Sequence, residues 1–261
     1  MIKLISLKSF VIQFPISSDV LENECQMLAL LAGIPKFSLV VFPEGALSGY
    51  SEDISFVDDI DLQALSSAIV RFKAYAVKAQ IHLTFGSCIY EQESWYNAAF
   101  YFGPNDEQFI YRKANLAMSE RGRFSAGNEL SCFEIQHYGH SVKVAFQLCR
   151  EIRFPEQWAA LARQGAQIFI YATNAVGDAA QADVWRSHLV SRAAENQRFV
   201  LCSNVAGEAQ KCPSMIINPQ GYVQWEMLSS EVEVGQSDLD LSTTSTWYLD
   251  QSRQDIIQHF V

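Results

Sequence analysis

The chain has 261 residues, of which 49% are hydrophobic and 18% are charged, so it can bury a large core. Its formal net charge is −10, which repels nucleic-acid backbones and anionic membrane surfaces at long range. No uncharged apolar run approaches the roughly 18 residues that a membrane helix requires. We therefore expect a small molecule or another protein as the partner, rather than nucleic acid or a membrane.

The predicted elements alternate between strands and helices along the whole chain. Residues 5–14 alternate apolar and polar side chains, which is typical of a strand. A signal peptide is disfavoured because Lys8 interrupts the apolar run and no small-residue cleavage site follows it. Further strands or hairpins are predicted at residues 37–44, 81–90, 95–113, 141–149, 167–174, 199–207 and 212–227. Helices are predicted at residues 19–32, 62–80, 155–165 and 182–197. This order indicates one α/β domain with more than one sheet and with helices on the outer faces.

The six cysteines are widely and irregularly spaced, which is not typical of a disulfide framework in a chain of this size. We expect free thiols and a cytoplasmic protein. Cys132, His137 and His140 match no zinc-binding spacing, and the stretch around them is typical of a hairpin turn. We therefore predict neither a metal site nor a cofactor.

Three residues of complementary chemistry follow predicted strands. Glu44 comes after "SLVVFP", Lys113 after "FIYR", and Cys149 ends "VAFQL". Layered α/β folds place their ligand sites just beyond the carboxyl ends of strands, where these side chains would gather. A thiol nucleophile needs a base and a donor for the developing oxyanion, and the three residues offer both. Taken singly, each residue is better explained by structure: Glu44 by a turn, Lys113 by a solvated strand end and Cys149 by a core thiol.

The blocks "VVFPEGALSGY", "YRKANLAMSERGRFSAGNE" and "CREIRFPE", in this order, resemble the three signature blocks of the nitrilase superfamily, the carbon–nitrogen hydrolases. The resemblance extends over about residues 1–235. It implies a four-layer α–β–β–α sandwich formed by a single domain, residues 1–261. It also implies a homodimer or higher homo-oligomer, in which the apolar C-terminal tail, residues 240–261, contacts the neighbouring subunit.

The resemblance also implies the roles of the site residues. Cys149 would be the nucleophile, Glu44 the base, and Lys113 together with the backbone N–H of Arg150 the oxyanion donors, while Glu120 would support them. The ordinary pKa values of Glu and Cys differ by about four units, or roughly 6 kcal/mol against the proton transfer. We expect burial beside Glu120 to raise the pKa of Glu44 and the charge of Lys113 to lower that of Cys149.

By the same resemblance, the reaction is cleavage of a non-peptide carbon–nitrogen bond through a thioester, with release of ammonia. The sequence favours a small amide, such as an ω-amide of a dicarboxylate, because Arg150-Glu151 replaces the Trp-Glu that commonly follows the cysteine in true nitrilases. Nitrile or N-carbamoyl-amine hydrolysis is the alternative within the enzyme class, and an inactive binding or scaffold protein is the alternative outside it. Candidate pocket residues are Tyr50, Met118, Asn174 and Asp178, together with Arg121 and Arg123, which would pair with a substrate carboxylate or be solvated loop charges.

Overall fold

Two six-stranded sheets pack face to face in the computed structural model, which describes residues 6–253 and 255. The first sheet has the order β12 (Glu233–Asp240), β1 (Ser6–Gln13), β2 (Leu39–Val41), β3 (His82–Glu91), β4 (Ser94–Phe102) and β5 (Gln108–Arg112). The second has the order β11 (Val223–Met227), β10 (Ser214–Ile217), β9 (Phe199–Ser203), β8 (Ile168–Ala172), β7 (His140–Leu148) and β6 (Phe133–His137).

Each sheet has a parallel centre, which brings several strand ends to one edge. In the first sheet β1, β2 and β3 are parallel, and in the second β7, β8 and β9 are parallel. In the second sheet Leu148 is in register with Ala172, and Ala172 with Ser203. The residues that follow these three, including Cys149, therefore leave the sheet side by side.

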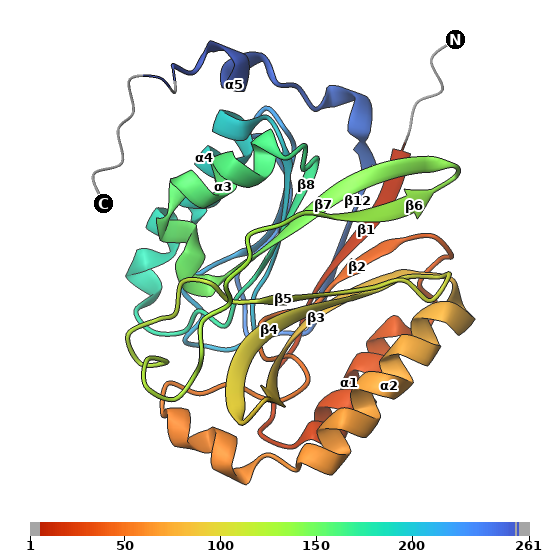
Figure 1. Cartoon of the computed structure of the whole chain (residues 1–261), viewed down its shortest axis with the longest axis vertical. Coiled ribbons are helices and arrows are strands. Elements are labelled where there is room, and N and C mark those ends of the chain that lie inside the picture. Colours follow the sequence, from red (N-terminus) through yellow and green to blue (C-terminus); the bar gives the residue numbers. More distant parts are fainter. Residues whose placement is uncertain (1–5, 254, 256–261) are drawn as a thin grey trace.

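Helices cover the outer face of each sheet (Figure 1). The pair α1 (Val20–Leu31) and α2 (Leu62–Ala79) covers the first sheet, and the pair α3 (Pro155–Arg163) and α4 (Ala182–Asn196) covers the second. The apolar face of each helix meets the sheet beneath it: Phe72 packs on Phe85 at 5.3 Å between ring centroids, and Trp158 packs on Phe169 at 5.0 Å. The predicted four-layer sandwich is confirmed.

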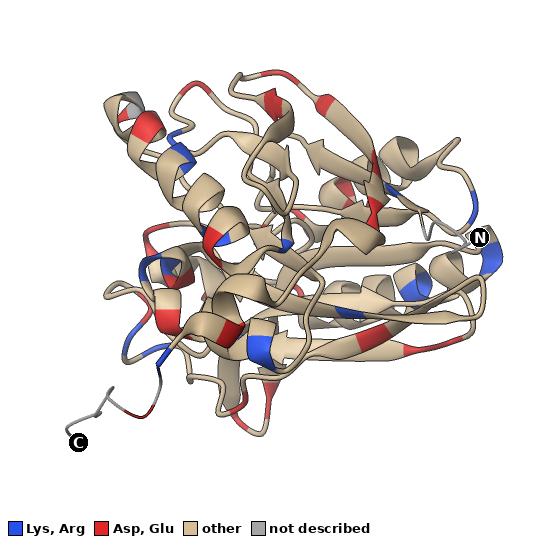
Figure 2. Ribbon diagram, turned by 90° about the horizontal axis from the view of Figure 1, so that it is seen from above, with Lys and Arg blue, Asp and Glu red and all other residues tan. Residues whose placement is uncertain are grey.

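An apolar core also fills the space between the two sheets. Tyr101 from the first sheet packs on Phe133 from the second with ring centroids 4.7 Å apart, and Phe133 packs on Phe146 at 5.0 Å. Charged residues lie mainly on the surrounding helices and loops (Figure 2). Because close-packed interiors resist sliding, the strand ends of one sheet keep a fixed position relative to those of the other.

The strand β12 was not predicted. It pairs antiparallel with β1 along its whole length, from Ser6 opposite Asp240 to Gln13 opposite Glu233. The sequence "EVGQSDLD" carries little apolar signal because this strand lies at the edge of its sheet. The 3₁₀ turn η4 (Leu241–Thr243) and the short helix α5 (Trp247–Gln251) follow it.

The predicted tail at residues 240–261 is only partly within the described residues. Trp247 and Tyr248 on α5 are 59% and 53% exposed. The apolar residues Ile256, Ile257 and Phe260 lie outside the described residues. No helix in the described ranges is long and apolar enough to cross a membrane.

Candidate active site

Glu44 is placed by a turn that lies directly on β3. The Gly86 N–H donates to the Pro43 carbonyl (2.9 Å), and a Cβ atom on Gly86 would lie 2.5 Å from the Glu44 Cα atom. Only a glycine permits this approach. Gly45 follows with a φ of +68°, which turns the chain away from the sheet. The Glu44 side chain is therefore fixed and fully buried.

Lys113 is the first residue after β5, and its backbone is held on both sides. Its N–H donates to the Asn97 carbonyl (2.8 Å), and its carbonyl accepts from the Gly127 N–H (2.9 Å). The side chain is fully buried, and its Nζ donates to Glu44 Oε1 (2.9 Å) and Glu120 Oε1 (3.0 Å). One ammonium group thus joins the two carboxylates.

Asn97 on β4 completes this cluster. Its Nδ2 donates to Glu44 Oε1 and to Glu120 Oε1, both at 2.7 Å. Asn97 was not predicted from the sequence, although an asparagine inside the otherwise apolar run "YNAAFYF" is a signal, because a buried amide needs partners. Glu120 gains two more donors, the Tyr50 hydroxyl (3.0 Å) and the Ala117 N–H (2.6 Å).

Both Glu120 and Lys113 are held in their charged forms. Burial alone would raise the pKa of Glu120, but the charge of Lys113 and the hydrogen bonds from Asn97 and Ala117 outweigh it, so its pKa is lowered. Burial would lower the pKa of Lys113, but Glu44 and the other acidic groups around it raise that pKa above its ordinary value. The pKa of Tyr50 is raised by burial and by Glu44 and Glu120, so its hydroxyl remains a donor.

Cys149 lies at the tip of a sharp turn between β7 and the 3₁₀ turn η2 (Cys149–Arg153). Its φ is +36°, a strained value for a residue other than glycine. The phenol of Tyr171 donates to its carbonyl oxygen (2.7 Å). Strained backbone of this kind clusters at functional sites, and here it holds the thiol beyond the strand end.

Glu151 connects the cysteine turn to the lysine strand. Its Oε2 accepts from the Leu148 N–H (2.8 Å), and its Oε1 accepts from the Ala114 N–H (2.9 Å) and the Tyr111 hydroxyl (2.7 Å). One fully buried side chain therefore ties the residue before Cys149 to the residue after Lys113. In the sequence Glu151 indicates only the substrate class, because its long-range partners are not visible there.

The electrostatics of Cys149 differ from the expectation. Burial and then the charge of Glu44 raise the pKa of its thiol to about 12, whereas Lys113 and the Thr173 hydroxyl act in the opposite direction. Lys113 does lower the pKa of Cys149 as predicted, but the net shift is upward because burial and Glu44 are stronger. The resting thiol is therefore protonated at neutral pH.

Two of the predicted pocket residues belong to the cluster. Tyr50 binds Glu120 through its hydroxyl, and the Asn174 N–H donates to Glu44 Oε2 (2.9 Å). Asn174 follows β8, so it lies at the same edge of the second sheet as Cys149.

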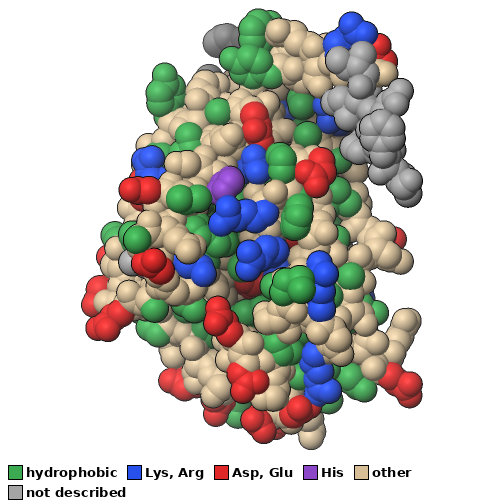
Figure 3. All heavy atoms as spheres, turned by 90° about the vertical axis from the view of Figure 1, so that its left-hand side faces the viewer, with side chains coloured by type: hydrophobic (Ala, Val, Ile, Leu, Met, Phe, Trp, Pro, Cys, Tyr) green, Lys and Arg blue, Asp and Glu red, His purple; other side chains and the backbone are tan. Residues whose placement is uncertain are grey.

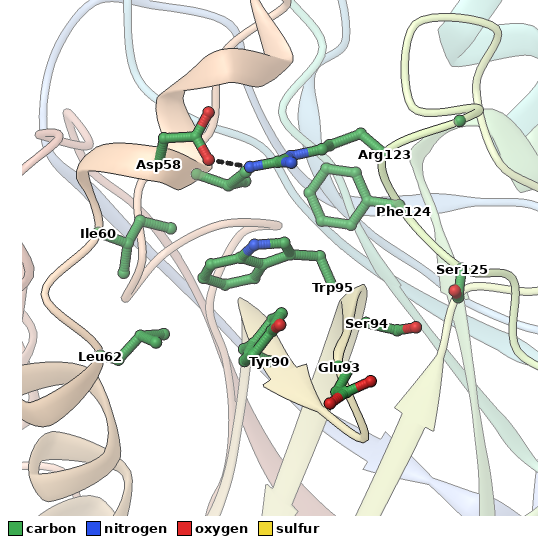
Figure 4. A pocket seen from close by; sticks show the side chains of 12 residues that line it. Asp58, Ile60, Leu62, Tyr90, Glu93, Ser94, Trp95, Arg123, Phe124 and Ser125 are labelled. Atoms are coloured by element: carbon green, nitrogen blue, oxygen red, sulfur yellow. Dashed lines mark hydrogen bonds and ion pairs between the residues drawn. The ribbon is translucent and has the colours of Figure 1, made fainter.

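The other predicted pocket residues lie outside the cluster. The Met118 side chain is 75% exposed, and Arg121 is exposed as well. Asp178 accepts from the Ala180 N–H (2.9 Å). Arg123 pairs with Asp58 beside a separate cavity of about 730 Å³, whose wall includes the ring of Trp95 (Figure 4). In the free protein the guanidinium of Arg123 therefore has a carboxylate partner of its own, and its pairing with a substrate carboxylate stays a prediction.

Comparison with known sequences identifies relatives over most of the chain. The carbon–nitrogen hydrolase family matches residues 11–248. A 2-oxoglutaramate amidase of Bacillus subtilis is 31% identical over 79% of this chain and 80% of its own length. An omega-amidase of Danio rerio is 30% identical over 69% of this chain and 67% of its own length.

Comparison with solved structures supports the fold independently. A carbon–nitrogen hydrolase from Helicobacter pylori G27 superimposes with a TM-score of 0.82, at 21% identity and with 97% of each chain covered. An amidase from Nesterenkonia sp. gives a TM-score of 0.79 at 21% identity, with 96% of this chain and 94% of its own covered. The chain belongs to the carbon–nitrogen hydrolase family.

Proposed function

We propose that the protein hydrolyses a small amide through a Glu44–Lys113–Cys149 triad and releases ammonia. The observation that carries this proposal is the buried cluster in which Lys113 Nζ donates to both Glu44 and Glu120 and interacts electrostatically with the thiol of Cys149. A scaffold protein would gain nothing from burying two carboxylates and an ammonium beside a thiol, because each of these charged groups is expensive to desolvate. Family membership supports the same chemistry.

In the first half of the reaction, Cys149 Sγ forms a bond to the amide carbon while its proton moves to the Glu44 carboxylate. The carbonyl oxygen gains the negative charge. Lys113 is the cationic donor for this oxyanion, and the N–H of Arg150, in the first turn of η2, is the second donor. The carbon–nitrogen bond then breaks, the leaving nitrogen takes the proton from Glu44, and ammonia departs.

In the second half, Glu44 takes a proton from a water molecule as that water attacks the thioester carbon. The carbon–sulfur bond breaks, Cys149 recovers its proton from Glu44, and the carboxylic acid product leaves. Glu44 is suited to both steps because its two oxygens are held by Lys113, Asn97 and the Asn174 N–H. Preorganisation of this kind lowers the barrier by removing the need to reorient the base.

The substrate class we favour is an ω-amide of a dicarboxylate. Two relatives support this choice by name, the 2-oxoglutaramate amidase and the omega-amidase. A nitrile or an N-carbamoyl-amine is the alternative. Ammonia release should be measured over a panel of ω-amides, neutral amides, nitriles and carbamoyl-amines, with Cys149→Ala as the inactive variant and Cys132→Ala as the control.

Each outcome of this experiment is informative. Turnover by Cys149→Ala would refute the mechanism, and turnover of nitriles alone would refute the amide preference. Cys132 is a suitable control because it is a free, partly buried thiol that the Leu161 carbonyl contacts, outside the catalytic cluster.

We further propose that the protein is a cytoplasmic homodimer with α5 at or near the contact. The six free cysteines support a reducing compartment. The exposed rings of Trp247 and Tyr248, which pack on each other at 4.7 Å, support a partner surface. Light scattering of the wild type and of Trp247→Ser tests the dimer, and a wild-type monomer with full activity would refute it.

A further inference from the structure

A group of cations surrounds the ring of Trp185 at the start of α4. Trp185 is only 3% exposed. The guanidinium carbon of Arg153 lies 5.5 Å from its ring centroid, and Lys211 Nζ lies 5.9 Å from it. Two cations thus share one aromatic ring, in a protein whose net charge is −10.

Among the described residues, neither of these cations has a carboxylate partner. The guanidinium of Arg153 contacts His188 Nε2 at 3.1 Å, and the nearby charges of Arg153 and Arg192 help burial to lower the pKa of His188. Glu195, seven residues after His188 on α4, is already paired with Arg192 at 2.8 Å.

The group also holds an unused donor. Trp185 Nε1 is buried and has no hydrogen-bond partner within the described chain. A buried N–H without a partner is unfavourable, and like charges placed close together are unfavourable as well. Both problems are removed by the same ligand, an anion with several acceptor oxygens.

The backbone places this group beside the candidate active site. Arg153 is the last residue of η2, the turn that begins with Cys149. The Lys211 N–H donates to the Ala175 carbonyl (3.0 Å), one residue after Asn174, whose N–H binds Glu44. Figure 3 shows basic side chains gathered near the middle of the face on which α3 and α4 lie.

Gly177 keeps the path of the Lys211 side chain open. A Cβ atom on Gly177 would lie 3.2 Å from Lys211 Nζ, and its φ of +136° disfavours any other residue. The loop that carries Gly177 is fixed to the Lys211 segment, because the Gly177 N–H donates to the Ala209 carbonyl (2.7 Å). The ammonium of Lys211 therefore lies close to the Gly177 backbone.

We propose that Arg153 and Lys211 form a carboxylate-binding subsite for the distal end of the amide substrate. This inference rests on the proposed function and names the groups that would recognise an ω-amide of a dicarboxylate. Arg153 is four residues after Cys149 in a 3₁₀ turn, which rises about 2 Å per residue, so their backbones lie about 8 Å apart along the turn. A four- or five-carbon substrate extends about 5 Å beyond its amide carbon, which the long Arg153 and Lys211 side chains can meet.

The test compares two amides of equal length, succinamate and butyramide, which differ in the distal carboxylate. We expect Lys211→Met to lower the ratio of kcat/KM for succinamate to that for butyramide about tenfold. Lys143→Met, a change in a lysine that contacts the Gln164 carbonyl instead, should leave this ratio unchanged. Arg153→Gln is the second variant, and its thermal unfolding midpoint is measured alongside because Arg153 also contacts His188. An unchanged ratio in folded Lys211→Met would overturn the subsite.

A second measurement separates this inference from the proposed function. If the wild type hydrolyses neither amide, the proposed function fails, and the subsite is then tested by calorimetric binding of succinate to the wild type and to Lys211→Met. Binding of succinate that weakens about tenfold in Lys211→Met supports the subsite. Equal binding to both proteins, or no binding to the wild type, refutes it.

Discussion

Replacing Glu120 by glutamine should be damaging although the two side chains have the same shape. Glu120 Oε1 accepts from Tyr50, Asn97 and Lys113, and Oε2 accepts from the Ala117 N–H. All four neighbours are donors. A glutamine has only one acceptor oxygen, so its NH₂ group must face a donor in either orientation.

The expected loss follows from these contacts. If the glutamine oxygen faces Lys113, the Ala117 N–H loses its buried acceptor, which costs about 1–3 kcal/mol. The remaining bonds change from charged to neutral acceptors, which are roughly half as strong, so we expect a total loss of about 3 kcal/mol. Lys113 also loses one of its two carboxylates, so kcat/KM should fall at least tenfold.

Urea unfolding followed by tryptophan fluorescence measures the stability, and ammonia release measures the activity. Glu129→Gln is the matched control, since Glu129 lies in the same long connection but is exposed. A Glu120→Gln variant within 0.5 kcal/mol of the wild type, on the order of an ordinary surface substitution, would show that the carboxylate form is not required.

Three further predictions concern the surroundings of the cluster. Thr173→Val should raise the pKa of Cys149 and slow its alkylation by iodoacetamide at pH 8 about tenfold, whereas Thr173→Ser should not. Equal alkylation rates in Thr173→Val and the wild type would exclude a role for the hydroxyl. Gly86→Ala should displace Glu44 and reduce kcat/KM about a hundredfold, with little change in activity contradicting the close packing. Burial lowers the pKa of His82 from 6.5 to about 4, so the unfolded chain binds a proton at a higher pH than the folded protein does. The stability that the neutral His82 contributes is fully present above pH 6.5 and is lost as the pH falls towards 4. Between pH 7 and pH 5 the free energy of unfolding should therefore drop about 2 kcal/mol more in the wild type than in His82→Gln, and parallel curves would refute this.

The sequence predicts the order of elements and the main candidate site residues because both depend on local patterns. Periodic apolar runs mark the strands and helices, and the polar residues that end such runs include Glu44, Lys113 and Cys149. The structure brings Lys113 within hydrogen-bonding distance of Glu44 and within electrostatic range of Cys149. The strand β12 escapes prediction because an edge strand needs few apolar residues.

What the sequence does not reveal depends on pairing between distant residues. Asn97 and Glu151 are important only because their partners lie 53 and 37 residues away, at Glu44 and Ala114. The ion pair of Arg123 is hidden for the same reason, since its partner Asp58 lies 65 residues before it. The direction of the pKa shift of Cys149 also depends on burial, which competes with Lys113 and outweighs it.

The raised pKa of Cys149 is consistent with a nucleophile once the charge of the whole cluster is considered. Lys113 carries one positive charge and the Glu44 and Glu120 carboxylates two negative ones, so loss of the thiol proton to solvent would add a further negative charge to a buried site. That is the process whose pKa is about 12. Transfer of the same proton to Glu44 leaves the total charge unchanged and places the new thiolate beside Lys113. The attack on the substrate should therefore depend on the Glu44 base and not on a pre-formed thiolate.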